Sequence, residues 1–549
     1  MKLKISKIAT MAIFGVLCFS CEDFLQVEQL NQQTTDDINN PEGVRKLDIG
    51  MFNNYAGSYN YFWPLFLSHC AGEYEFKEPV NEGPYHFEMW NLNPSPVNPF
   101  IGWLYSAFYS TISSANRIIA IIDNDEGTIG QMPAEEKDRI LGSAYFMRGL
   151  SYFYLLHIWG RPFDGDDQWG VVVHTDVVDT RDEIKKARSK PSEVYALIES
   201  DFSKAKLLLP DPADLPDTEL GRPTKSSAIT MLGKTLVFEK KYSEAISEFE
   251  EFMLNYCDAG KASKNYKGLL EYYGDNFHGR NYENSIESLF EIQFADLVTT
   301  NPWQGGGTGS HFQIYCGGPD MGRGNVSVRD TLFFDFKNYD IRKVESRFHY
   351  YDANTNSPNY ADTIIFHGQT IVCRDSVMLF KDGKPNKMAP YKYSNKTENS
   401  PKKYINHLRD ANNAQGMATD IGDENQVVLR VAEVYFLYAE ALAESSGDMN
   451  KAKLLINKVT RRAYGYYEDE VSPYDFAGSG PQEFTTYLRA EKRKEFIGEQ
   501  VRWFDMIRWG IAEQECLLTG RIFTTRAACW PIPNREIAAN PLCEQAPGY

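Results

Sequence analysis

Helical hairpins are the sequence feature that most limits the fold of this chain. Thr224 can cap a helix whose apolar residues recur at helical spacing, and a short turn at residues 240–242 leads to a second apolar stripe. The two stripes consist of Ala228, Met231, Leu232, Leu236, Ala245, Ile246, Phe249 and Phe252. Small residues such as Gly233 let paired helices approach closely. The segment therefore predicts two helices that pack against each other.

A second hairpin is predicted over residues 427–444 and 449–462, joined by residues 446–448. Both hairpins resemble a tetratricopeptide unit, but their uneven spacing excludes a regular array of repeats of about 34 residues. A degenerate set of such repeats is favoured, with unrelated helical hairpins as the alternative.

Other segments divide into predicted helices and predicted loops. Helices are predicted from Pro41, around Trp103–Asn116, over Ala144–Trp159 and from Pro191. Between Cys257 and Gln426 the chain is rich in glycine, asparagine and aromatic residues, with short alternating runs at residues 288–294 and 363–366. This composition predicts long loops with small strands. The fold class predicted for the 549 residues is mainly α, with loop excursions and small β elements.

The N-terminal residues are typical of an exported lipoprotein. Three lysines precede an apolar run at residues 8–19, which is shorter than the roughly 20 residues that span a bilayer. The run ends before Cys21, and it resembles a lipobox in which Cys18 takes the position usually held by Leu. Lipidation is therefore expected at Cys21, and an ordinary secretory signal is the alternative.

The charge of the chain disfavours some classes of partner, and its cysteine content argues against a disulfide scaffold. The formal charge is −18, which disfavours nucleic acid and anionic lipid as partners. Nine cysteines are too few for a disulfide scaffold in a chain of this length, although Cys516, Cys529 and Cys543 could pair in some combination.

Five motifs along the chain carry a resemblance to one family. They are Trp103-x5-Tyr109-x2-Ile112-x2-Ala115-Asn116; Arg148-Gly149-Leu150 with residues 152–156 and 159–162; residues 430–435 with 438–441; residues 489–496 with Glu499 and 502–510; and residues 531–533 with 536–537 and 540–541. In this order after a lipobox, they resemble the SusD/RagB family of nutrient-binding outer-membrane lipoproteins of Bacteroidetes.

The resemblance implies a fold, a partner and a task. It implies a core of tetratricopeptide-like hairpins, lipid anchoring on the cell-surface side of the outer membrane, and a SusC-like TonB-dependent barrel transporter. The protein would cap that barrel as a lid and deliver a captured nutrient without covalent chemistry or a cofactor. The expected organisation is a signal peptide over 1–20, a tether over 21–40, an N-terminal helical region over 41–256 and a C-terminal region over 257–549.

The charged motif near the C-terminus is predicted to be structural. Glu491, Glu495, Glu499 and Arg502 lie at helical spacing, so ion pairs with neighbouring basic residues are expected. The glutamates could imitate a glycosidase dyad, but a solvated helix face is the favoured interpretation.

Motifs for catalysis or metal binding are weak. The sequence has no nucleophile elbow, zinc-protease helix or phosphate loop, and its histidines are scattered. The acidic turn at residues 164–167 could hold calcium, but it lacks a distal bidentate glutamate and is interpreted as a solvated turn. No enzyme activity and no resident metal are expected.

Ligand capture has better support, because aromatic residues make up 14% of the chain. Sugar rings stack their C–H faces on aromatic side chains, and their hydroxyl groups bond polar side chains. The first predicted ligand edge comprises Trp63, Glu73, Tyr74, Tyr85, Trp90 and Asn91. The second comprises Trp303, His311, Tyr315 and Arg323 in a glycine-rich segment. The alternative is that these residues anchor loops or contact the barrel.

Three functions remain open from the sequence. Glycan capture is the favoured function. The alternative is oligopeptide capture by the same lid mechanism, as the RagB side of the family implies. A surface glycosidase is the third, and it would need two carboxyl groups about 5–10 Å apart in a cleft.

Overall fold

The computed structural model describes most of the chain after the predicted tether. The described residues are 38–59, 63–76, 83–124, 129–277, 282–294, 315–316, 325–337, 339–347, 362–373, 379–381, 384–386, 401–404, 424–445 and 447–549. Cys21, the signal peptide and nearly all of the tether lie outside these residues, as do Trp303, His311 and Arg323.

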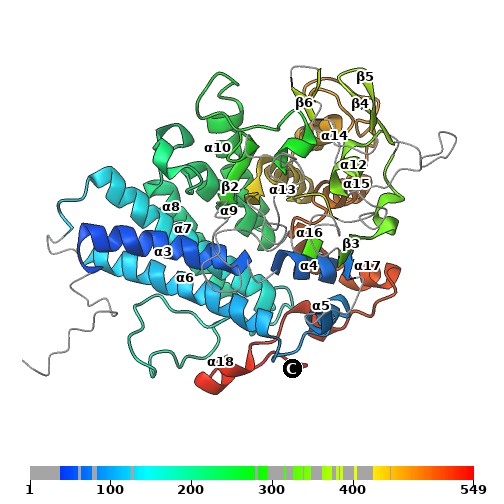
Figure 1. Cartoon of the computed structure of the whole chain (residues 1–549). Helices are drawn as coiled ribbons and strands as arrows, with labels where there is room; N and C mark the ends of the chain where they lie inside the picture. Colours follow the sequence, from blue (N-terminus) through cyan, green and yellow to red (C-terminus); the bar gives the residue numbers. More distant parts are fainter. Residues whose placement is uncertain are drawn as a thin grey trace, which may run out of the picture.

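The N-terminal half is a succession of packed helices. Their bounds are α3 (Pro41–Tyr59), α6 (Pro99–Asp123), α7 (Ala134–Trp159), α8 (Pro191–Leu208), α9 (Lys225–Phe238) and α10 (Tyr242–Phe252). Each of these helices packs against the next one in this series, from α3 against α6 to α9 against α10. Together they form one side of the molecule (Figure 1). All the helices predicted in this half are confirmed.

The hairpin of α9 and α10 owes its close packing to a glycine. A Cβ atom at Gly233 would lie 2.5 Å from Cε1 of Phe249, so no larger residue fits without a shift. Thr224 is the N-cap of α9, and its backbone N–H donates to the Ser227 hydroxyl at 3.1 Å.

The second hairpin begins later than predicted. Its helices are α13 (Val431–Glu444) and α14 (Met449–Ala463). Gln426–Arg430 forms strand β8 instead of helix, because its backbone pairs antiparallel with β2 (Ser288–Ile292). Helix α13 packs against α9 and α10, which joins the two hairpins.

Most of the remaining elements lie in the second half of the chain. The other helices are α4 (Trp63–Ala71), α5 (Gly83–Trp90), α12 (Ile341–Ser346), α15 (Pro481–Glu495), α16 (Val501–Arg508), α17 (Ala512–Leu518) and α18 (Asn534–Ala539). The other strand pairs are β1 (Tyr74–Phe76) with β3 (Val326–Val328), β4 (Asp362–Phe366) with β5 (Gln369–Cys373), and β6 (Leu379–Lys381) with β7 (Lys384–Asn386). The predicted strands at 288–294 and 363–366 correspond to β2 and β4.

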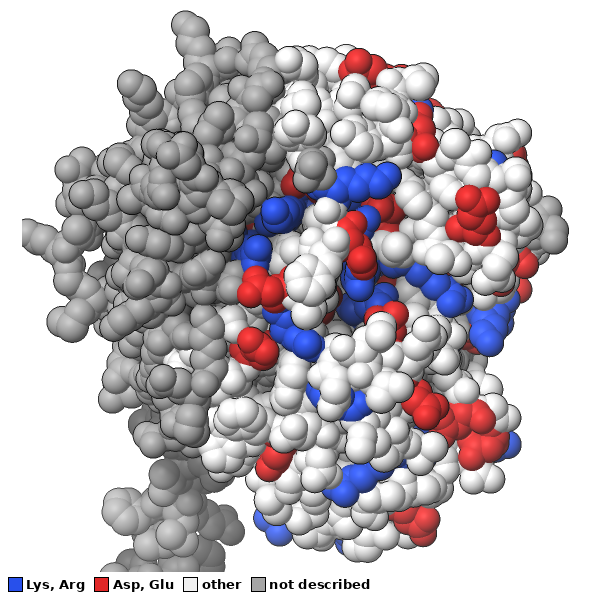
Figure 2. Space-filling view, turned by 90° about the vertical axis from the view of Figure 1, so that its right-hand side faces the viewer, with Lys and Arg blue, Asp and Glu red and all other residues white. Residues whose placement is uncertain are grey.

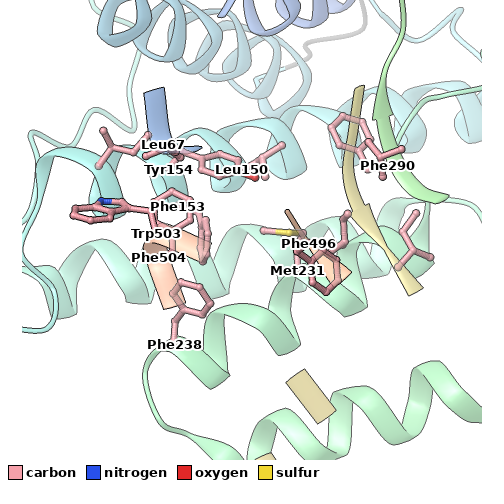
Figure 3. Close-up of a cluster of buried hydrophobic side chains, with 14 of the residues drawn as sticks. Leu67, Leu150, Phe153, Tyr154, Met231, Phe238, Phe290, Phe496, Trp503 and Phe504 are labelled. Atoms are coloured by element: carbon pink, nitrogen blue, oxygen red, sulfur yellow. The ribbon is translucent and has the colours of Figure 1, made fainter. Parts of the chain in front are cut away.

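One hydrophobic core joins segments that are distant in the sequence. Figure 3 shows Phe153 and Tyr154 of α7 close to Trp503 and Phe504 of α16. In the same cluster, Phe290 of β2 lies 5.2 Å from Phe146 of α7, ring centre to ring centre. Side chains from both predicted regions therefore share this core.

A buried ion network replaces the predicted solvated face. Arg430 bonds Glu287 at 2.9 Å, Glu495 at 2.8 Å and Glu499 at 2.7 Å, and all four side chains are buried. Arg342 likewise bonds Glu491 at 2.7 Å. The prediction of a solvated helix was wrong, because arginines from other segments neutralise these glutamates inside the core.

Cysteines and hydrophobic helices add two observations. Cys516, Cys529 and Cys543 are buried free thiols, so the pairing left open from the sequence does not occur in the structure.

Among the described residues, no helix combines the length and apolar character that crossing a membrane requires.

Candidate functional site

The first predicted ligand edge folds into α4, β1 and α5. Trp63 is fully buried, with its ring centre 4.8 Å from Tyr154 and 6.1 Å from Phe108. Tyr74 is also fully buried. Burial corrects the expectation for these two residues, because core rings present no free face on which a sugar could stack.

Glu73 is a buried carboxyl group rather than an exposed ligand contact. The backbone N–H of Gly498 donates to its Oε2 at 3.1 Å, and Oε1 has no hydrogen-bond partner among the described residues. Burial raises the pKa of Glu73 to about 7. This carboxyl group therefore keeps its proton to a higher pH than an ordinary glutamate does.

One residue of the second predicted edge, Tyr315, is described, and it packs against the first edge. Strand β1 pairs with β3, with Tyr74 opposite Val328, and β1 also packs against α5. The Tyr315 ring is buried, 5.2 Å from His86 and 6.5 Å from Phe76 between ring centres. Tyr315 thus joins the edges as a packed side chain.

Two buried histidines that were not among the predicted ligand residues lie on α4 and α5. His69 Nε2 and His86 Nδ1 are 3.2 Å apart, and His69 Nδ1 lies 2.8 Å from the carbonyl oxygen of Tyr74. Burial lowers the pKa of His69 to about 4 and that of His86 well below its usual value. The neutral rings support α5; His86 stacks on Phe76 at 4.3 Å.

The part of this region open to solvent is aromatic and polar. Tyr85 and Trp90 are half-buried, and Asn91 is exposed. Trp103, which the sequence assigned to the scaffold, is 42% exposed; its ring and that of Tyr85 both lie edge-on to Phe100. These four side chains are the ones that solvent reaches in this region, so an apolar ring face and its hydroxyl groups could bind to them.

Two arginines flank the tryptophan of this surface. The guanidinium carbon of Arg521 lies 4.6 Å from the centre of the Trp90 ring, and that of Arg329 lies 5.3 Å from it. We call Trp90, Asn91, Arg329 and Arg521 the Trp90 cluster. The sequence carries no signal for the arginines, since both are more than two hundred residues away from Trp90 along the chain.

A separate pocket of about 280 Å³ lies between α6, the segment around residues 172–184 and the C-terminal residues. Tyr105 and Tyr109 form part of its wall, with ring centres 4.7 Å apart. None of the predicted ligand residues lines this pocket.

The acidic groups proposed for chemistry have structural partners. Glu491 and Glu495 are buried against arginines, so they cannot serve as a glycosidase pair. Asp167 accepts hydrogen bonds from the backbone N–H and hydroxyl of Ser192, at 2.8 and 2.7 Å, at the start of α8. The described residues contain no group of three His, Cys, Asp or Glu side chains arranged to hold a metal ion.

Comparison with known proteins gives one consistent family. A model of the SusD family matches residues 286–517, and a SusD-like model described as starch-binding and associating with the outer membrane matches residues 23–236. The SusD-like protein P25 of Formosa agariphila is 22% identical to this chain over 98% of both chains.

Solved structures confirm the mainly helical fold. A SusD homologue from Bacteroides thetaiotaomicron superposes with a TM-score of 0.70 and 22% identity, covering 94% of this chain and 99% of its own. Surface glycan-binding protein A of the same species, solved in complex with laminarihexaose, gives a TM-score of 0.64 and 18% identity over 92% of this chain and 99% of its own.

Proposed function

Because this chain belongs to the SusD/RagB family, we propose that it captures a glycan or oligosaccharide outside the cell without transforming it. The observation that carries the proposal is the set of aromatic side chains that solvent reaches, the half-buried Tyr85 and Trp90 and the exposed Trp103, together with the exposed Asn91. Solved structures of similar proteins support it, since one of them is a complex with laminarihexaose.

The chemistry of the surface suits a sugar. Exposed ring atoms of the aromatic side chains can cover an apolar sugar face, and the Asn91 amide offers both a donor and an acceptor to hydroxyl groups. Binding requires no covalent step, in keeping with the structural roles of Glu491 and Glu495.

Delivery forms the second part of the proposal. The lipobox-like sequence at Cys21 and the family description support lipid anchoring at the cell-surface side of the outer membrane. There the protein would act as a lid on a SusC-like TonB-dependent barrel, which accepts the captured nutrient.

Calorimetric titration of the soluble form, lacking residues 1–21, against a panel of oligosaccharides and oligopeptides tests ligand capture. We expect an oligosaccharide to bind and Trp90→Ala to weaken its affinity about fivefold to tenfold, because an aromatic contact contributes about 1–1.5 kcal/mol. Trp303→Ala tests the second predicted edge in the same way. Leu207→Ala, at an exposed position on α8, is the control.

Two results would count against this proposal. Binding of peptides and of no oligosaccharide would establish the peptide alternative. Unchanged sugar affinity in Trp90→Ala would move the site away from α5 while leaving glycan capture intact.

A further inference from the structure

The Trp90 cluster holds two positive charges for which the described residues provide no carboxylate partner. Arg521 donates from Nη1 to the carbonyl oxygens of His69 at 2.8 Å, Cys70 at 2.9 Å and Trp90 at 3.2 Å. Burial, and to a lesser degree the charge of Arg329, lower the pKa of Arg521 below its usual value. The two like charges are therefore close enough to oppose each other.

Guanidinium groups in the core of this protein are neutralised differently. Arg148 bonds Asp201 at 2.7 Å, and Arg508 bonds Glu440 at 2.6 Å through each of two nitrogen atoms. A charge withdrawn from water without an opposite charge is costly. The arrangement around Trp90 thus lacks a counter-ion that other buried arginines have.

Arg329 is the cation with hydrogen-bonding capacity to spare. Its Nη1 is shielded from solvent and has no hydrogen-bond partner among the described residues, whereas Nη1 of Arg521 already serves three carbonyl groups. The acids close to it along the paired strands are engaged elsewhere. Asp330 pairs with Arg347, Glu75 accepts from the Ser327 hydroxyl at 3.3 Å, and the Glu73 carboxyl group accepts from the Gly498 N–H at 3.1 Å.

The backbone fixes the position of Arg329 beside strand β1. Arg329 directly follows β3, and its N–H donates to the carbonyl oxygen of Glu73 at 3.1 Å. A paired strand therefore fixes its Cα relative to α5 before any ligand arrives.

Figure 2 shows lysine and arginine atoms interspersed with aspartate and glutamate atoms around the recessed centre of the side on which β3, α12 and α17 lie in Figure 1. Cations are therefore available on this face although the formal charge of the chain is −18.

We propose that the Trp90 cluster selects an acidic glycan, one that carries a carboxylate or a sulfate group. The anionic group accepts hydrogen bonds from Arg329, as guanidinium groups bind planar or tetrahedral oxyanions, while Asn91 bonds neighbouring hydroxyl groups. This inference rests on the proposed capture of glycans and names the class of glycan that the site takes.

Matched pairs of ligands test the inference on the wild-type protein. Oligogalacturonides are compared with neutral galacto-oligosaccharides of equal length, and sulfated carrageenan oligosaccharides with their desulfated forms, at constant ionic strength. We expect at least tenfold tighter binding of the acidic member of one pair, and the pair that responds distinguishes carboxylate from sulfate. Equal affinities within both pairs would overturn the inference and leave glycan capture standing.

Variants then assign the effect to Arg329. Arg329→Gln should remove the preference for the acidic member, Arg329→Lys should retain part of it, and Arg117→Gln, at an exposed ion pair on α6, should leave it unchanged. A preference that survives in Arg329→Gln would contradict the assignment. If that variant does not fold, the comparison of ligand pairs on the wild type still decides the glycan class.

Two further probes separate the acidic glycan from other anions. Sodium sulfate alone, against sodium chloride of equal ionic strength, should compete weakly compared with the sulfated oligosaccharide. Free sulfate or a glutamate hexapeptide binding as tightly as the acidic glycan would overturn the assignment to a sugar. Failure of every oligosaccharide to bind would instead reject the proposed function itself.

Discussion

At the scale of single residues, Glu73 connects β1 to the C-terminal part of the chain. Its carboxylate accepts from the Gly498 N–H, and Gly498 has a φ of 76°, in the left-handed region that favours glycine. A Cβ atom at Gly498 would also lie 1.9 Å from the Tyr74 hydroxyl oxygen. The contact beneath the ligand surface thus depends on a glycine and on a carboxyl group withdrawn from water.

The raised pKa of Glu73 predicts a pH-dependent contribution to stability. The folded state holds this proton more tightly, so the contribution is complete below the ordinary value of 4.5 and is lost as the pH rises through about 7. Glu73→Gln keeps an acceptor for Gly498 without the charge. In urea denaturation, the free energy of unfolding of the variant relative to that of the wild type should therefore rise between pH 5 and pH 8, by about 3 kcal/mol at most. A pH-independent difference would contradict this.

At the scale of secondary structure elements, local patterns predicted the helices well and one strand poorly. Apolar periodicity and caps such as Thr224 belong to the helix itself, so they can be recognised without knowing its neighbours. Residues 426–430 follow no such rule, because their extended form depends on pairing with β2, more than 130 residues earlier. Because α13 begins directly after this segment, the helix predicted from the sequence extends too far toward the N-terminus.

The contact between α9 and α10 can be tested at Gly233. Gly233→Ala should lower the free energy of unfolding by about 1–3 kcal/mol, because the added methyl group meets the buried Phe249 ring. Gly50→Ala in α3 is the matched control: its Cβ would meet no atom within 4 Å, and better helix propensity should stabilise the protein by about 0.5–1 kcal/mol. Equal effects of the two substitutions in chemical denaturation would argue against a close helix contact.

At the scale of the whole molecule, the buried ion network connects the C-terminal helices with strands from the middle of the chain. Glu495 bonds Arg430 and Arg462, and Glu287, which directly precedes β2, bonds the same two arginines. The arginines lower the pKa of Glu495 to about 2, despite its complete burial. Each charge in the network thus depends on partners from other elements.

Glu495→Gln should destabilise the protein by about 3–5 kcal/mol at neutral pH, because it leaves buried arginines with one carboxylate fewer. The stabilisation by this group is present above its ordinary pKa of 4.5 and is lost as the pH falls toward 2. The difference from the wild type in denaturation experiments should therefore shrink on acidification. Arg117→Gln, at an exposed pair, should cost less than about 1 kcal/mol.

The sequence by itself determined the helices, the family and the features of an exported lipoprotein, since each of these depends on neighbouring residues or on ordered motifs. It also predicted ligand edges within residues 63–91 and in the glycine-rich segment, but it did not indicate which of their side chains would be exposed. Tertiary structure alone decided that Trp63, Tyr74 and Tyr315 are buried and that Arg329 and Arg521 lie against Trp90. Burial and charge pairing join residues hundreds of positions apart, so no local pattern records them.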